Sequence, residues 1–296
     1  MKPIASIHDP KERLVAFVKE RQRIYEVRLA GAPKPWTTDP ILQRFRFSNM
    51  LRENDVVTKW IADNWRTPNV NHPDLWFAIV VARLVNEPLT LTEMGFPLRQ
   101  GLTQNNWNRG HFERTIRRRK AAGLRTYNPA YMVPACSTVA PKVELNLRVL
   151  DDLWASRKTL RPKEGDTLRS WHILVGQFWG IGSFIVAQVI ADLKYASGTP
   201  LERAKDWMTF AASGPGSRRG MCRLEGRPVS EWKRDSEDVW WQKLIRLRNE
   251  IMPLLKGTAL YEAHAQDFQS FLCEWDKWER ARLGEGFPKQ KYNGQS

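Results

Sequence analysis

The sequence predicts an all-α fold, and three observations lead to this prediction. Apolar residues recur every three or four positions through most of the chain, as they do on one face of a helix. The two-residue alternation of half-buried strands is scarce. Typical helix-starting residues also precede periodic segments, for example Asp39 followed by Pro40.

The predicted helices follow one another with short interruptions. A proline-containing segment, AGAPKPW, ends the first helix, and prolines mark loops around residues 88–97 and 128–141. Asp206 stands where a further helix is expected to begin. The predicted helical segments are 11–29, one or two helices within 40–65, 75–84, 111–122, 143–156, 166–178, 183–195, 238–252 and 262–283.

Three regions are expected along the chain. Residues 1–38 form an N-terminal helix and linker, residues 39–286 a single helical domain, and residues 287–296 a polar tail. We find no internal repeat that would divide the middle region further.

The charge indicates a polyanionic partner. Lys and Arg number 47 against 32 Asp and Glu, which leaves a net charge of +15. Nucleic acid is the expected partner. We expect no membrane interaction and an intracellular location, because the chain has neither a long apolar run nor a signal-peptide core. Three separated cysteines and five scattered histidines predict no structural metal.

A Gly-Ile-Gly turn joins the predicted helices of residues 168–195, in a helix-hairpin-helix pattern. Gly180 and Gly182 permit a sharp turn and close approach of the backbone, and Ser183 starts a helix with unpaired N–H groups. Such a helix start favours a DNA phosphate. The alternative is a tight corner between two core helices.

A basic stretch, RTIRRRK, is the second predicted DNA contact. Arg117, Arg118, Arg119 and Lys120 lie within a predicted helix and should add salt-sensitive affinity for the duplex.

Asp206 follows the hairpin at a spacing that resembles helix-hairpin-helix DNA glycosylases. In that class a catalytic Asp lies a little over twenty residues after the hairpin glycines, at a helix start. The resemblance implies a glycosylase-like helical fold with a central cleft. The alternative for Asp206 is a plain N-cap.

The stretch SGPGSRRG predicts an anion-binding loop. Gly214 and Gly216 free backbone N–H groups, while Arg218 and Arg219 provide forked donors for phosphate or diphosphate. The alternative is an exposed basic loop. No Walker motif occurs in the sequence.

Two further stretches carry charged groups at helical spacing. In FRFSNMLRENDVVTKW, Arg52 and Asp55 would share a helical strip near Asn49, as a cleft wall or as a solvated salt-bridge ladder. In FLCEWDKWERARLGEGFPKQKY, charges alternate in sign from Glu274 to Arg280, which predicts an exposed helix face.

Four elements together resemble a known phage family: RFSNMLRENDVVTKW, GIGSFIVAQVIADLKY, GPGSRRG and LCEWDKWERARLGEG. The family comprises the α-glutamyl/putrescinyl thymine pyrophosphorylases, or amino acid:DNA transferases. It is related to the helical domain of 5-hydroxymethyluracil DNA kinases. The resemblance spans roughly residues 39–286. Those kinases carry a separate P-loop domain, whereas this sequence contains no Walker motif. The resemblance therefore favours the transferase branch.

The resemblance implies a transferase acting on phage DNA that contains modified uracil. An amino acid or polyamine would displace pyrophosphate from a 5-(pyrophosphoryloxymethyl)uracil extruded from the helix. No cofactor is expected, and the need for a divalent metal ion is left open. The protein would work in the host cytoplasm.

The candidate residues receive their roles in the implied transfer reaction from the chemistry of their side chains. Arg218 and Arg219, with the backbone of Gly214 and Gly216, would hold the diphosphate. Asp206 is the first candidate for the base and Asp55 the second. Asn49 and Arg52 would read the uracil or the incoming carboxylate. Asp192 is expected to be a structural cap or an ion-pair member.

Two other functions remain open. A DNA glycosylase would share the hairpin, an Asp and base flipping, but it would leave abasic sites. A non-catalytic DNA-binding module would keep the basic residues and tolerate loss of Asp55 and Asp206.

Overall fold

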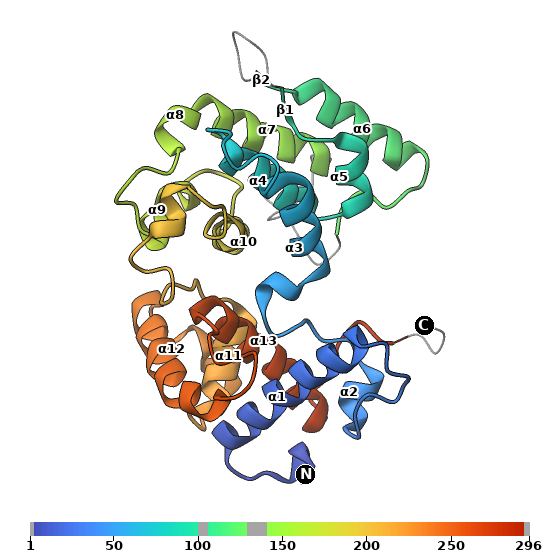
Figure 1. The fold of residues 1–296 in the computed structure, drawn as a ribbon, viewed down its shortest axis with the longest axis vertical. Coiled ribbons are helices and arrows are strands. Elements are labelled where there is room, and N and C mark those ends of the chain that lie inside the picture. Colours follow the sequence, from blue (N-terminus) through green and yellow to red (C-terminus); the bar gives the residue numbers. More distant parts are fainter. Residues whose placement is uncertain (1–2, 100–105, 129–140, 293–296) are drawn as a thin grey trace. The chain divides into compact units, whose positions relative to one another are not determined.

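The computed structural model describes residues 3–99, 106–128 and 141–292, and their architecture is all-α (Figure 1). In this part of the chain the strands β1 (Leu98–Arg99) and β2 (Asn106–Trp107) form one short antiparallel pair. The all-α class is therefore confirmed, whereas the helix-hairpin-helix, glycosylase-like fold with a central cleft stays a prediction. The chain divides into two compact units, which we call unit 1 (residues 1–55 and 208–296) and unit 2 (residues 56–207). The division expected at residues 38 and 286 stays a prediction.

Unit 1 is built around its last helix, which contacts four other α-helices. Aromatic side chains of this helix, among them Phe268, Trp275 and Trp278, are fully buried at its centre. The elements of unit 1 are η1 (Ile4–Ser6), α1 (Pro10–Leu29), α2 (Pro40–Arg44), η2 (Arg52–Asn54), α11 (Pro215–Leu224), η5 (Val229–Lys233), α12 (Glu237–Ile251), η6 (Met252–Leu255) and α13 (Ala265–Arg282).

Unit 2 surrounds the helix α4 (Leu75–Val85), which is apolar except for Arg83 and of which every residue is buried. Helices α5, α7 and α10 pack against it. The other elements of unit 2 are α3 (Val56–Ile61), the π-helical turn η3 (Ala62–Arg66), α5 (Pro88–Met94), α6 (Arg109–Ala121), α7 (Lys142–Ala155), α8 (Arg157–Leu160), α9 (Leu168–Gly176), α10 (Ser183–Leu193) and η4 (Pro200–Arg203).

Helix starts follow the predicted capping chemistry. The Asp39 carboxylate accepts hydrogen bonds from the backbone N–H groups of Ile41 and Leu42, both at 2.9 Å, and Pro40 occupies the first turn of α2. Such a cap satisfies N–H groups that have no partner within the helix. Asp9 caps α1 in the same way.

Three predictions of local structure are wrong. Residues 88–94 form helix α5 and not a loop, because proline in the first turn is compatible with a helix. No helix starts at Asp206, since residues 205–209 form turns. Residues 45–60 are not continuously helical: only the 3₁₀ turn η2 and helix α3 form there, and Asp55 between them is extended, with φ −68° and ψ 137°.

The polar face of α13 is also not exposed. The residues Glu274, Asp276 and Glu279 are at most 3% exposed. Arginines from other helices of unit 1 satisfy two of them: Arg13 pairs with Glu279, and Arg223 with Asp276. The alternation of charge thus reflects internal ion pairs.

One buried ion pair ties the helices of unit 2 together. Both nitrogens of the Arg83 fork donate to the Asp192 carboxylate at 2.5 Å, and both side chains are 0% exposed. Arg83 also donates to Asn86 and Thr58, so α4, α10 and α3 meet at one guanidinium. The expectation that Asp192 has an ion-pair role is confirmed.

Asp192→Ala should lower the free energy of unfolding by about 3–5 kcal/mol, because it leaves the Arg83 charge buried without its partner. Urea denaturation measures this loss. Asp152→Ala, at an exposed position of α7, is the control and should change stability by less than about 0.5 kcal/mol. A loss below about 1 kcal/mol for Asp192→Ala would contradict the proposed importance of the pair.

Candidate functional site

The Gly-Ile-Gly turn joins α9 to α10 as the sequence predicts. Gly180 has φ +79°, and a Cβ atom there would lie 2.4 Å from Val149 Cγ2 on α7. Both the left-handed backbone and the close packing therefore require glycine. Gly182 precedes α10, whose N-terminus has no side-chain cap. The positive end of this helix is available to an anion.

The surface around the turn combines exposed apolar side chains with polar ones. Trp179 is 40% exposed and Phe184 49% exposed, and the Arg148 guanidinium lies 4.2 Å from the centre of the Trp179 ring. The hydroxyl of Ser183 lies 3.2 Å from Nε2 of His172. A cation stacked on an exposed indole beside a helix N-terminus is a suitable surface for nucleic acid.

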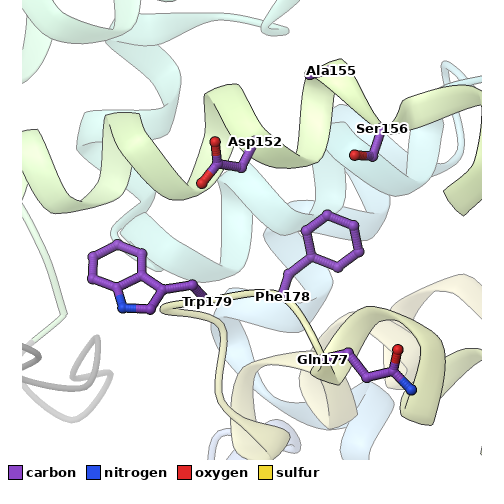
Figure 2. Close-up of a pocket in the computed structure, with 6 residues that line it drawn as sticks. All are labelled: Asp152, Ala155, Ser156, Gln177, Phe178 and Trp179. Atoms are coloured by element: carbon purple, nitrogen blue, oxygen red, sulfur yellow. The ribbon is translucent and has the colours of Figure 1, made fainter.

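An open pocket of about 440 Å³ lies beside this turn (Figure 2). Phe178 and Trp179 line it from the turn, and Asp152 and Ser156 line it from the neighbouring helical segment.

Asp206 caps helix α9. Its two carboxylate oxygens accept hydrogen bonds from the backbone N–H groups of Leu168 at 2.8 Å and Arg169 at 3.0 Å. The carboxylate is therefore engaged with a helix N-terminus, although across the fold and not at the start of its own helix. This geometry fits the structural alternative that the sequence left open, and the catalytic role stays a proposal.

The basic stretch of α6 is largely paired within the protein. Arg117 donates to Glu113 at 2.9 Å, and Arg118 pairs with Glu93 at 2.9 Å. Arg119 is 4% exposed and bonds to Glu93 and to the carbonyl oxygen of Arg125. Lys120 is exposed. Carboxylates thus offset much of the local charge that the sequence suggests.

The sequence SGPGSRRG does not form a free loop, because residues 215–224 form helix α11. This helix packs closely along α13 (Figure 1). A Cβ atom on Gly216 would lie 2.5 Å from Cys273 Sγ, and one on Gly220 would lie 2.5 Å from the Leu272 carbonyl oxygen. The glycines allow two helices to approach closely.

The two arginines of this helix have protein partners. Arg218 donates to the Ser213 hydroxyl at 2.6 Å and to Glu237 at 2.7 Å, and Arg219 donates to Asp276 at 2.9 Å. Although burial raises the pKa of Glu237, hydrogen bonds from Ser213 and Arg218 outweigh it, and the pKa lies below its usual value. Diphosphate binding here would have to compete with these carboxylates.

The segment of residues 45–55 surrounds a buried arginine that the sequence analysis did not select. Arg21 is 1% exposed, and its Nη2 donates to the Asn49 Oδ1 at 3.1 Å and to the carbonyl oxygens of Phe47 and Ser48 at 3.0 Å. Its Nε and Nη1 are buried without a hydrogen-bond partner. Burial lowers the pKa of the Arg21 guanidinium, although Tyr292 and Glu274 act in the opposite direction.

Arg52 has the same property. Its backbone N–H donates to Asp267 at 2.9 Å, but its side-chain Nε and Nη2 are buried and lack a hydrogen-bond partner. Unsatisfied buried donors of a charged group are rare in proteins and require an explanation. An anion would satisfy them. For Arg21 a signal was present in the sequence, because this charged residue lies on the apolar face of the predicted helix 11–29.

Acidic groups of α13 hold the same segment. Glu274 accepts from the Ser48 backbone N–H at 3.0 Å and pairs with Lys277 at 2.5 Å. Although burial lowers the pKa of Lys277, Glu274 opposes it, and the pKa lies above its usual value. Burial raises the pKa of the neighbouring Cys273 thiol to about 11, so it is no nucleophile at neutral pH.

The candidate residues therefore fall in two sets. Unit 1 contains Asn49, Arg52, Asp55, Arg218 and Arg219, whereas unit 2 contains Asp206, the hairpin and the basic helix. Within unit 1, Arg21 links directly to Asn49, while Arg218 and Arg219 bind separate carboxylates.

Two other kinds of feature are absent from the described part of the chain. No group of three or more His, Cys, Asp or Glu side chains there could hold a metal ion. Nor does any helix in this part combine the length and apolar character that crossing a bilayer requires.

Comparison with known proteins gives a consistent result. A sequence model of the family described as "5-hmdU DNA kinase, helical domain" matches residues 10–286. A 5-hmdU DNA kinase of Bacillus phage SP10 is similar to this chain, with 25% identity over 226 residues. The alignment covers 68% of this chain and 34% of the phage enzyme, so the chain spans about a third of that relative's length. No solved structure matches the chain.

Gly216→Ala should lower the free energy of unfolding by about 1–3 kcal/mol, because the new methyl group would push α11 away from Cys273. Gly214→Ala is the matched control, since a Cβ there would lie 3.6 Å from Gln269, at ordinary contact distance. Equal stability of both variants in thermal denaturation would refute the packing role of Gly216.

Asp206→Ala should lower the free energy of unfolding by about 0.5–2 kcal/mol, because α9 loses its capping carboxylate. Asp206→Asn keeps one oxygen acceptor and should recover part of this loss. Chemical denaturation of both variants measures the difference. No loss in Asp206→Ala would contradict the capping role.

Proposed function

Because this chain belongs to the family of 5-hmdU DNA kinase helical domains, we propose that it acts in the hypermodification of phage DNA containing 5-hydroxymethyluracil. More specifically, the chain is a transferase that displaces pyrophosphate from 5-(pyrophosphoryloxymethyl)uracil with an amine. An amino acid or a polyamine supplies the amine. The proposal includes a helix-hairpin-helix, DNA glycosylase-like fold for the chain.

One observation supports an anionic substrate more than any other. Arg21 is buried and Arg52 half-buried, and each guanidinium group has two buried nitrogens without a protein partner. A buried donor without an acceptor lowers the stability of the protein, and a diphosphate offers several charged acceptors. We therefore add Arg21 and Arg52 to Arg218 and Arg219 as proposed diphosphate ligands. The backbone of Gly214 and Gly216 keeps its proposed share of this role.

The proposed reaction breaks one bond and forms another. The bond between the C5-methylene carbon and the diphosphate oxygen breaks, and the electron pair leaves with the diphosphate. The amine nitrogen bonds to the same carbon and loses one proton to a base. Cationic donors stabilise the charge that develops on the leaving group. Asp206 is the first proposed base and Asp55 the second, because a carboxylate within hydrogen-bond reach of the amine can accept the proton that it loses.

In this proposal the helix-hairpin-helix turn binds the DNA backbone. The N-terminus of α10, after Gly180 and Gly182, contacts a backbone phosphate, and Ser183 adds a hydroxyl donor. Lys120 and the paired arginines Arg117, Arg118 and Arg119 contribute longer-range attraction. Asn49 contacts the extruded uracil or the incoming carboxylate.

The direct test uses DNA bearing pyrophosphorylated hydroxymethyluracil and a pool of amino acids and polyamines. Mass spectrometry of the nucleosides should show an amine-substituted thymine, with release of pyrophosphate. Abasic sites would replace the proposal with a DNA glycosylase. Phosphate transfer from ATP to hydroxymethyluracil would replace it with a kinase. Unchanged DNA that is nevertheless bound would indicate a non-catalytic binding module.

Arg52→Ala should lower the rate of product formation by about 10²–10³-fold, because it removes donors aimed at the leaving group. Arg246→Ala, at an exposed position of α12, is the control and should retain the rate. Single-turnover kinetics separate this effect from product release. An unchanged rate in Arg52→Ala would remove Arg52 from the site.

The two roles of Asp206 can be separated with the same assay. Asp206→Asn keeps a capping oxygen but cannot accept the proton, so a catalytic role predicts a large loss of rate in a stable protein. A rate that follows stability alone would assign Asp206 to capping only.

A further inference from the structure

Unit 1 carries an exposed group of cations that have no carboxylate partner among the described residues. These cations are Arg28, Lys34, Arg44 and Arg46. They lie against three aromatic rings, those of Trp36, Phe287 and Tyr292. We call these seven residues the cation–aromatic surface.

Backbone pairing brings the two parts of this surface together. Phe45 forms an antiparallel bridge with Lys291, the Arg46 N–H donates to the Gln290 carbonyl oxygen at 3.0 Å, and the Tyr292 N–H donates to the Arg44 carbonyl oxygen at 3.1 Å. The segment after α2 therefore lies beside the C-terminal segment of unit 1. Two further exposed lysines, Lys289 and Lys291, belong to the latter.

Rings hold these cations in place without neutralising them. The Arg28 guanidinium lies 5.0 Å from the Trp36 ring centre, and the Lys34 ammonium lies 5.1 Å from the same ring. The Arg46 guanidinium lies 5.9 Å from the ring of Tyr292, which itself contacts Trp36 edge-on at 5.8 Å. A cation–π contact fixes a cation but leaves its full charge for an anion.

Nearby carboxylates are engaged elsewhere. Asp39 caps α2, Glu26 accepts from Gln22, and Glu285 pairs with Arg223 at 2.5 Å. This is the opposite of α6, where acidic side chains offset the arginines. None of these carboxylates forms an ion pair with the four cations of the surface.

An exposed ring completes the surface. Phe287 is 61% exposed and stacks on the buried Phe45, with the ring centres 5.6 Å apart and the planes at 18°. Most of the Phe287 side chain is therefore open to solvent although one side of the ring lies against Phe45. Arg44 lies 6.0 Å from this ring. A fixed aromatic face beside unpaired cations can stack a base while the cations hold its phosphates.

We propose that the cation–aromatic surface of unit 1 binds single-stranded DNA, with Arg44 and Arg46 on the phosphates and Phe287 stacked on a base. The inference rests on the proposed function for DNA as the substrate, and it adds a second DNA-binding surface besides the hairpin of unit 2. Bases in a duplex are already stacked, so the ring favours an unpaired strand.

Fluorescence anisotropy of the full chain tests this with a labelled thymidine oligonucleotide of about 16 nucleotides. Arg44→Ala/Arg46→Ala should weaken binding at least about 10-fold at low salt. The slope of log affinity against log salt should fall by about 1.4, or about 0.7 for each lost phosphate contact. Arg246→Ala/Lys256→Ala removes two exposed cations elsewhere in unit 1 and should change affinity by less than about 2-fold.

Phe287→Ala tests the stacking part and leaves the charge unchanged. It should weaken oligonucleotide binding about 5- to 100-fold without changing the salt slope, and it should weaken duplex binding less. Because the side chain is mostly exposed, the fold should tolerate its loss.

Three outcomes would overturn the inference. Equal losses in both double variants would show attraction by net charge alone. Unchanged binding in Phe287→Ala would remove the stacking platform. Binding to anionic lipid vesicles without binding to the oligonucleotide would assign the surface to a membrane. The transfer assay and the binding assay test different claims. Expected binding changes together with no transfer by the unmodified chain would refute only the proposed function. Normal transfer together with unchanged binding in the variants of the cation–aromatic surface would refute only this inference.

Discussion

A buried guanidinium group must meet acceptors or carry a large free-energy cost, and this constraint shapes both units of the protein. In unit 2, Arg83 is fully buried and satisfied by Asp192, Asn86 and Thr58, so three helices have to meet at one point. In unit 1, carboxylates along α13 serve the same purpose for arginines of α1 and α11. Polar groups therefore specify how these aromatic-rich cores assemble.

Two arginines of unit 1 depart from this pattern of satisfied guanidinium groups. Arg21 and Arg52 each keep two buried side-chain nitrogens without a hydrogen-bond partner. Both belong to or contact the segment of residues 45–55, which tertiary hydrogen bonds hold in a largely non-helical form. This combination of an irregular backbone and unsatisfied cationic donors is typical of binding sites more than of structural cores.

Net charge alone is a poor guide to where a polyanion binds. The most basic run of the sequence, in α6, is offset by Glu93, Glu113 and Glu144. Less conspicuous cations around Trp36 and Tyr292 come from separate stretches of the chain and have no acidic partner among the described residues. Ion pairing decides how much of a formal charge of +15 is available to a ligand.

Local chemistry explains what the sequence by itself determined. Periodicity and capping residues predicted the all-α fold and most helices, because both signals act within a few residues of the chain. The turn at Gly180 and the structural role of Asp192 were also accessible in this way. The four short motifs also indicated a relationship to the helical domain of 5-hydroxymethyluracil DNA kinases, and the match of that family's model to residues 10–286 agrees with it.

Only the tertiary structure decided how polar residues are used. SGPGSRRG resembled an anion-binding loop, but close packing on α13 makes it the start of a helix whose arginines bind carboxylates. Asp206 proved to cap α9, and Arg21 proved to have unsatisfied donors next to Asn49. The partners of these groups lie far away in sequence, and hydrogen bonding and burial depend on distance in space. Sequence patterns therefore revealed the helices, whereas the availability of each charged group emerged only after the helices had packed.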